Sequence, residues 1–109
     1  MAGVLNHDTW HAWTRHVQQK MAQYRISPLL IKRIIRAPQR IEEGIAEKTI
    51  AVMQAAGRGR RKHEVWVMYQ KKDAVALIIS AWRYPGASPL GKPPCIPEDA
   101  LKALADNQV

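Results

Sequence analysis

The sequence predicts an α+β fold in which two N-terminal helices pack on a four-stranded antiparallel sheet and a short helix ends the chain. Two observations favour this architecture. Apolar residues recur at helical spacing as far as Pro38, whereas beyond it they alternate or run together over strand-sized lengths. The 109 residues suffice for one domain. We expect residues 1–86 to form its core and residues 87–109 to form a Pro-rich linker and the final helix.

The first helix is expected to follow Thr9, a capping residue, and to run to about Tyr24. At roughly 100° per residue its apolar stripe contains Trp10, Trp13, Val17, Met21 and Tyr24. His16 and Lys20 lie one turn apart on the flank of that stripe, where a side chain is neither fully buried nor fully exposed.

The second helix has a favoured start, because Ser27 can cap it and Pro28 occupies its first turn. Its apolar face contains Leu30, Ile31, Ile34 and Ile35, and its other side contains Lys32, Arg33 and Arg36. Pro38 disfavours helical geometry at the preceding residue, so we expect the helix to end there.

Four strands are expected after the second helix. The first two span residues 40–46 and 49–55, and the glycine-punctuated basic loop at residues 57–62 is typical of a hairpin tip. Residues 63–70 alternate in polarity as a strand does. The apolar run at residues 74–84 predicts a central strand that is covered on both faces.

The last part of the chain contains an extended loop and one helix. Four prolines and one glycine from Ala87 through Pro97 indicate the loop, and Pro97 with two following acids begins a helix to about Ala105. The predicted core contains Trp13, Val17, Leu30, Ile34, Val67, Leu77 and Ile79.

The charge distribution favours a polyanionic partner. The net charge is +8, and the segment from Thr9 to Ile41 contains seven lysines and arginines without a single acid. Such a surface attracts nucleic acid, although a solvated basic face without a ligand is the alternative. The candidate phosphate contacts are Lys32, Arg33, Arg36, Arg40, Arg58, Arg60, Arg61 and Lys62. The basic hairpin tip could equally be a soluble, mobile loop.

Other classes of protein are disfavoured by composition. The single cysteine, Cys95, excludes an internal disulfide and fits a reducing compartment. The start of the chain lacks the pattern of a signal peptide, and the apolar stretch 74–82 is too short to cross a bilayer, so we expect a cytoplasmic protein without membrane contact. His7, His11 and His16 lack a cysteine or carboxylate at metal-ligand spacing, so we expect no metal and no other cofactor.

Two constellations could carry chemistry. His16 is a proton carrier near neutral pH beside the fixed cation of Lys20, and Arg83 with Tyr84 ends the central strand. Arg83 continues an otherwise apolar face, so it must emerge at an edge, find a partner or be used. The structural alternatives are an ion pair of Arg83 with Glu64 or Glu43, a core-edge ring for Tyr84 and a packing or capping role for His16.

Several blocks of sequence carry a family resemblance. They are His16, Lys20 and Met21, Ile26-Ser27, Arg40 to Gly44, Thr49 to Gln54, Glu64 to Gln70 and Ile78 to Gly86. These blocks resemble an uncharacterised family of small bacterial proteins. The order of elements, the size and the basic surface resemble the RelE-like toxin fold within the barnase–colicin–RelE group of ribonucleases.

The resemblance implies a toxin that acts as a metal-independent endoribonuclease, with RNA favoured over DNA and a small acidic antitoxin as a partner. It would assign His16 as the proton carrier, Arg83 and Lys20 as phosphate stabilisers and Tyr84 as an accessory acid or stacking ring. We therefore expect His16, Lys20 and Arg83 to converge on one site. A non-catalytic nucleic-acid-binding module and a structural or partner-binding protein are the alternatives.

Overall fold

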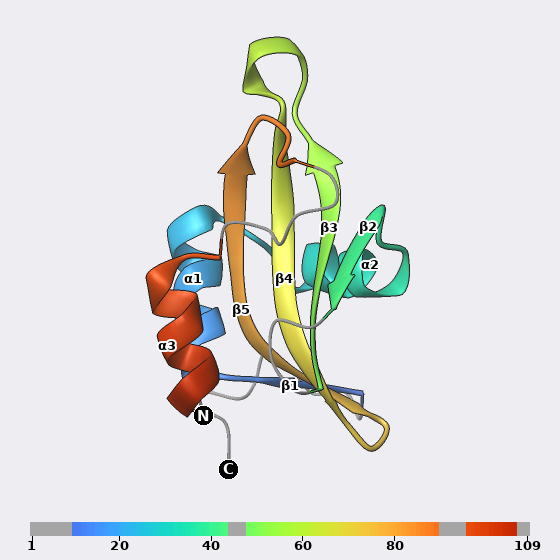
Figure 1. Cartoon of the computed structure of the whole chain (residues 1–109), viewed down its shortest axis with the longest axis vertical. Coiled ribbons are helices and arrows are strands. Elements are labelled where there is room, and N and C mark those ends of the chain that lie inside the picture. The colour runs from blue at the N-terminus through green and yellow to red at the C-terminus, as the bar shows by residue number, and fades with distance from the viewer. Residues whose placement is uncertain (1–9, 44–47, 90–95, 107–109) are drawn as a thin grey trace.

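The computed structural model describes residues 10–43, 48–89 and 96–106 of the chain, and its fold is α+β (Figure 1). Within these described residues, three α-helices accompany one five-stranded mixed sheet with the strand order β1-β5-β4-β3-β2. The elements are β1 (His11–Trp13), α1 (Arg15–Tyr24), α2 (Pro28–Arg36), β2 (Arg40–Glu43), β3 (Thr49–Ala56), the 3₁₀ turn η2 (Gly59–Arg61), β4 (His63–Lys72), β5 (Val75–Pro85) and α3 (Glu98–Asp106).

The four expected antiparallel strands are present, and a fifth strand makes the sheet mixed. β1 pairs in parallel with β5, where His11 lies opposite Ala76 and Trp13 opposite Ile78. The first helix therefore begins later than predicted, and Thr14 takes the capping role expected of Thr9 by accepting from the Val17 N–H. Helical spacing could not reveal β1, because its partner is more than sixty residues away in sequence.

The second helix forms as predicted. The Ser27 hydroxyl accepts a hydrogen bond from the Leu30 N–H at 3.1 Å, Pro28 is in the first turn, and the helix ends with Ala37 as its C-cap. α1 ends at Arg25 in the left-handed region, with φ of 55°. Three residues thus connect the two helices.

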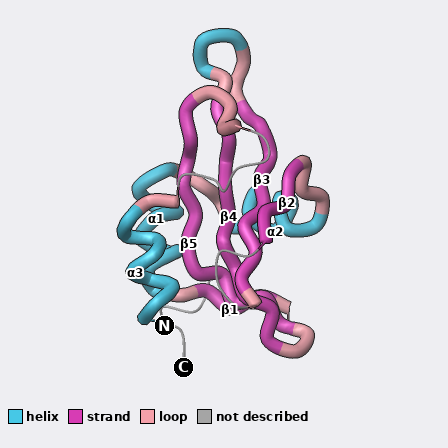
Figure 2. Tube along the Cα trace, viewed as in Figure 1, coloured by secondary structure: helices cyan, strands magenta, loops and turns pink. Residues whose placement is uncertain are grey.

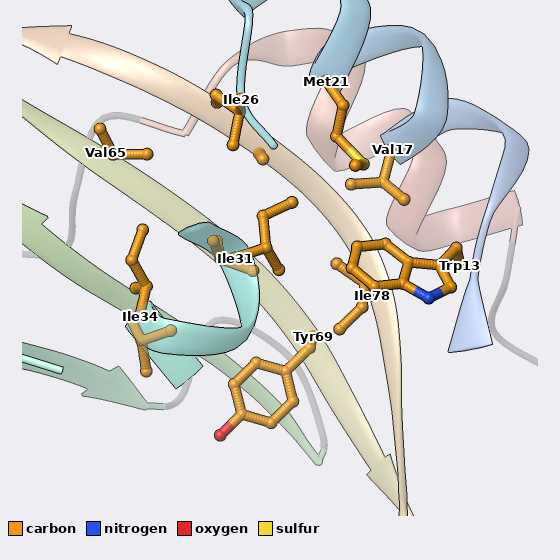
Figure 3. Close-up of a cluster of buried hydrophobic side chains, with 12 residues drawn as sticks. Trp13, Val17, Met21, Ile26, Ile31, Ile34, Val65, Tyr69 and Ile78 are labelled. Atoms are coloured by element: carbon orange, nitrogen blue, oxygen red, sulfur yellow. The ribbon is translucent and has the colours of Figure 1, made fainter. Parts of the chain in front are cut away.

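The sheet separates two apolar clusters. The two-helix face carries α1 and α2 over Val52, Val65, Val67, Ile78 and Ala81, and Figure 3 shows Val17, Met21, Ile31 and Ile34 packing there. The opposite α3 face carries Ala100, Ala103 and Leu104 of α3 over Met53, Trp66, Met68, Ile79 and Trp82. Of the predicted core, Leu30 and Leu77 are only partly buried, while the other five residues are buried. The final helix thus belongs to the same core as the first 86 residues.

A β-bulge changes the faces along β5. The register between β4 and β5 shifts at Met68 and Tyr69, so Tyr69 lies opposite Ile78 whereas Met68 lies opposite Ser80. Arg83 consequently shares the two-helix face with Ala81 and Ile78, and not with Leu77 and Ile79 as strict alternation predicts.

The turn between β3 and β4 projects beyond the neighbouring strands at the top of Figure 1, and Figure 2 marks its 3₁₀ turn in the helix colour. Within the described residues no helix has both the length and the apolar character needed to cross a membrane. Cys95 lies outside the described residues.

Candidate nucleic-acid interface

The hairpin tip, residues 57–62, is held in one conformation by its own backbone. The Arg61 N–H donates to the Arg58 carbonyl at 3.0 Å, and the Lys62 N–H donates to the Gly59 carbonyl at 3.2 Å. The Gly86 N–H donates to the Lys62 carbonyl at 3.0 Å, which ties the tip to the end of β5. These bonds favour an ordered tip over the mobile loop that the sequence also allowed.

Gly57 is required for this conformation. Its φ is +77°, and a Cβ at this position would lie 2.1 Å from the Arg61 carbonyl oxygen. Gly59 also has positive φ, but a Cβ there would meet nothing within 4 Å. The folded tip leaves the side chains of Arg58, Arg60, Arg61 and Lys62 exposed to solvent. The structure therefore presents four cations on a pre-organised turn.

His63 connects the tip to Arg83. Its Nδ1 lies 2.8 Å from the Arg61 carbonyl oxygen, which can only accept, so Nδ1 carries the proton. Its Nε2 then accepts a hydrogen bond from Arg83 Nη1 at 2.8 Å. The geometry fixes the tautomer of His63. His63 alternates with Val65, Val67 and Tyr69 and therefore lies on the same face of β4. This alternation is visible in the sequence, but His63 was not among the predicted site residues.

Arg83 is anchored at the C-terminus of α1. Its Nε donates to the Tyr24 carbonyl at 2.9 Å, and its Nη2 donates to the Arg25 carbonyl at 3.1 Å. These acceptors take the place of the ion pair with Glu64 or Glu43 that the sequence suggested. The three bonds described use three of the five N–H groups of the guanidinium. Arg83 is half-buried and oriented, and in the described part of the chain it retains donors for an anion.

The cations of α2 lie beside the same surface. Arg33 Nε donates to Gln54 Oε1 at 3.3 Å, and Gln54 lies opposite Val65 on the two-helix face of the sheet. Arg33 and Arg36 are exposed, while Lys32 is half-buried. We call the surface formed by Arg25, Arg33, Arg36, His63, Arg83 and the hairpin tip the basic face. It extends from the ends of α1 and α2 to the tip of the hairpin.

Arg40 does not belong to the basic face, which corrects its assignment as a phosphate contact. Its side chain is only 9% exposed and pairs with Glu42 at 2.7 Å. Its Nη1 donates to the Ser88 hydroxyl at 2.6 Å, and its guanidinium lies 5.3 Å from the Trp66 ring centroid. Arg40 instead fastens the segment after β5 to the α3 face.

A buried carboxylate, which the sequence suggested only as an ion-pair partner of Arg83, joins this network. Glu64 is 4% exposed, and its Oε1 accepts from Trp66 Nε1 at 3.0 Å and from the Ser88 hydroxyl at 2.7 Å. Such a group is costly to bury unless its oxygens are hydrogen-bonded. Glu64 therefore has a packing role on the α3 face.

His16 and Lys20 lie at the seam between α1 and α3. His16 Nε2 is 2.9 Å from the Ser80 hydroxyl, and Lys20 forms an ion pair with Asp99 of α3. The pKa of His16 is lowered below its ordinary value, chiefly because the ring is buried. The carboxylates of Asp99 and Asp106 raise this pKa, and the charge of Lys20 lowers it further. Pairing with Lys20 holds the pKa of Asp99 below its usual range.

Two of the polar groups at this seam, Ser80 and Lys20, are buried or paired. A serine hydrogen-bonded to a histidine is the arrangement of nucleophilic catalysis, but Ser80 is 1% exposed. The Lys20 side chain is 15% exposed and its charge is matched by Asp99. A packing role, one of the alternatives for His16, fits these contacts.

The four predicted catalytic side chains do not form one site. His16 contacts Ser80 on the α3 face, whereas Arg83 lies on the two-helix face beside Tyr24. Residues 16 and 24 are two helical turns apart, about 12 Å along the axis of α1. Tyr84 lies opposite Glu64 and packs against the α3-face cluster. The expected convergence of His16, Lys20 and Arg83 is therefore not formed.

Among the described residues, no group of three or more histidine, cysteine or acidic side chains could hold a metal ion, and His7 lies outside that part of the chain. Comparison of the chain with family models, with curated proteins and with solved structures finds no match.

Proposed function

We propose that this protein is a nucleic-acid-binding module that contacts phosphates through the basic face. The observation that carries the proposal is the hairpin tip, where four exposed cations stand on a turn held by backbone hydrogen bonds and by Gly57. Pre-organisation lowers the conformational entropy lost on binding, so cations on a fixed turn bind a polyanion better than the same cations on a mobile loop.

Arg83 and His63 extend this surface toward the helices. The guanidinium is oriented by three hydrogen bonds, and a fixed planar guanidinium is suited to donating hydrogen bonds to phosphate oxygens. Arg33 and Arg36 add cations at the rim. The net charge of +8 favours RNA or DNA as the polyanion, and RNA is the polymer that the toxin-like resemblance suggests.

Binding without chemistry is the form of this proposal that the geometry supports best. A ribonuclease of the RelE-like kind would require the proton carrier and the phosphate stabilisers to meet at one phosphate. His16 and Lys20 are committed to α3, and Arg83 lies on the other face of the sheet. A small acidic protein, such as an antitoxin, is the second partner class that the basic face would attract.

Salt dependence of binding tests the proposal. The double substitution R60A/R61A at the tip removes two charges, and K71A/K72A removes two exposed charges from the opposite end of β4. We expect the tip variant alone to reduce the slope of log affinity against log salt, by about 0.7–0.9 for each lost phosphate contact. Equal effects of the two variants, or no binding by the unsubstituted protein, would contradict the proposal.

A further inference from the structure

We infer that the ligand of the basic face is a double helix, whose groove receives the hairpin tip, and not a single strand. This inference rests on the proposed function and specifies its substrate class. It follows from where the aromatic rings lie and from the shape of the hairpin.

Single strands are bound chiefly by stacking of splayed bases on exposed aromatic rings. The large rings of the sheet are not available for stacking: Trp66 is fully buried, Trp82 is 2% exposed and Tyr69 is 6% exposed. Trp66 and Trp82 stack on one another, with ring centroids 6.3 Å apart, beneath the α3 face. The sheet therefore uses its rings as core.

The rings nearest the basic face are also occupied. Tyr24 is partly buried against both apolar clusters, and Lys20 lies over its ring at 5.8 Å. Tyr84 packs against the cluster of the α3 face. At the basic face itself, the side chains available to contact a nucleic acid are the arginines and Lys62, the imidazole of His63 and the amide of Gln54.

One exposed ring, Trp10, lies at the other end of the sheet. It is 60% exposed, and its carbonyl accepts from the Ala76 N–H at the start of β5. The hairpin tip is tied to the other end of β5, near Pro85. Nine residues of strand separate these ends by about 30 Å, so Trp10 cannot stack a base that is held at the tip.

The shape of the hairpin fits a groove between two phosphate backbones. A two-stranded ribbon can enter the B-form major groove, which is about 8.5 Å deep. Gln54, which holds Arg33, and Arg58 at the tip are four residues apart, so the chain between them spans at most roughly 13 Å. The tip can therefore reach into the groove while Arg33 remains at the phosphates along its rim.

Fluorescence anisotropy with four labelled probes of one sequence, about 20 nucleotides long, tests the inference: a DNA duplex, an RNA duplex and a single strand of each. We expect one or both duplexes to bind about tenfold more tightly than the single strands at the same salt. R60A/R61A should reduce this preference, and Trp10→Ala should leave every affinity unchanged. A stronger DNA duplex would indicate a B-form groove, and a stronger RNA duplex an A-form helix.

Three outcomes would overturn the inference. Single strands that bind as tightly as duplexes, or a loss of affinity in Trp10→Ala, would indicate stacking, while the proposed nucleic-acid binding would stand. Failure of all four probes to bind would remove the proposed function together with the inference.

Discussion

Arg83 Nε donates a hydrogen bond to the Tyr24 carbonyl at 2.9 Å, so an arginine at the end of β5 holds the C-terminus of α1. The same guanidinium reaches His63 at the base of the hairpin. One side chain thus joins α1, β4 and β5 on the two-helix face. The integrity of the basic face and the packing of α1 depend on the same residue.

Arg83→Lys should destabilise the protein although it preserves the charge. A lysine ammonium cannot reproduce the three directions in which the guanidinium donates, so carbonyls at the end of α1 and His63 Nε2 lose their donor. We expect a loss of about 1.5–3 kcal/mol in the free energy of unfolding, measured by urea denaturation. Arg36→Lys on the exposed side of α2 is the control and should change stability by less than about 0.5 kcal/mol. Equal stabilities of the two variants would refute the anchoring role.

Gly57→Ala and Gly59→Ala should separate the conformation of the tip from its charge. Both substitutions place a Cβ at positive φ, which costs about 1–2 kcal/mol, but only the Gly57 variant also meets the Arg61 carbonyl. We expect Gly57→Ala to weaken nucleic-acid binding more than Gly59→Ala does, with every cation retained. Anisotropy and thermal unfolding of both variants measure the two effects. If the two variants bind equally well, the fixed conformation of the tip does not contribute to affinity.

Local patterns in the sequence predicted the helices and antiparallel strands well. Ser27 and Pro28 begin α2, and the apolar run from residue 74 forms β5, as caps and apolar content indicated. These features depend on neighbours along the chain. β1 depends instead on pairing with β5, and for this reason the first helix was predicted several residues too long.

The candidate site was harder to predict for the same reason. The bulge in β5 places Arg83 with Ala81 and Ile78, so its face could not be found by counting alternate residues from Leu77. The positive charge of Arg40 could not indicate that its guanidinium donates to Ser88, which lies 48 positions away in the sequence. The hairpin tip that carries Arg60 was predicted correctly, because it is a local turn between two neighbouring strands.

The stability of the protein should fall as the pH drops below about 6.5 in a manner that depends on His16. Burial lowers the pKa of His16 in the folded state, so the unfolded chain binds the proton more readily. The neutral ring therefore contributes its full stabilisation above the pKa that His16 has in the unfolded chain. This stabilisation is lost as the pH falls through that pKa toward the lower pKa of His16 in the folded state. In His16→Gln, the free energy of unfolding, measured by urea denaturation, should vary less between about pH 5 and 7.5 than in the unsubstituted protein.

The groups that face His16 provide a second measurement of the same effect. Asp99 and Asp106 on α3 raise the pKa of His16, while Lys20 on α1 lowers it. Asp99→Asn removes one of the opposing carboxylates, so the pKa of His16, followed by NMR titration of its ring, should fall further. A pKa that rises in this variant would show that α3 does not lie over His16 as described.

Arg40 and Arg36 should show opposite effects on stability and binding, although both are arginines of the basic N-terminal half. Arg40→Ala removes hydrogen bonds to Ser88 and Pro89 and the contact with Trp66, so we expect unfolding to become easier by about 1–3 kcal/mol. Its salt slope for nucleic-acid binding should match that of the unsubstituted protein, because a guanidinium that is 9% exposed cannot release counterions from a phosphate backbone.

Arg36→Ala should leave the unfolding free energy within about 0.5 kcal/mol of its original value, because the side chain lies exposed on α2. It should reduce the salt slope by about 0.7–0.9, the contribution of one phosphate contact. Urea denaturation and anisotropy over a series of salt concentrations measure both quantities for both variants. A reduced slope in Arg40→Ala would place phosphates on the α3 face, and an unchanged slope in Arg36→Ala would exclude the outer side of α2 from the interface.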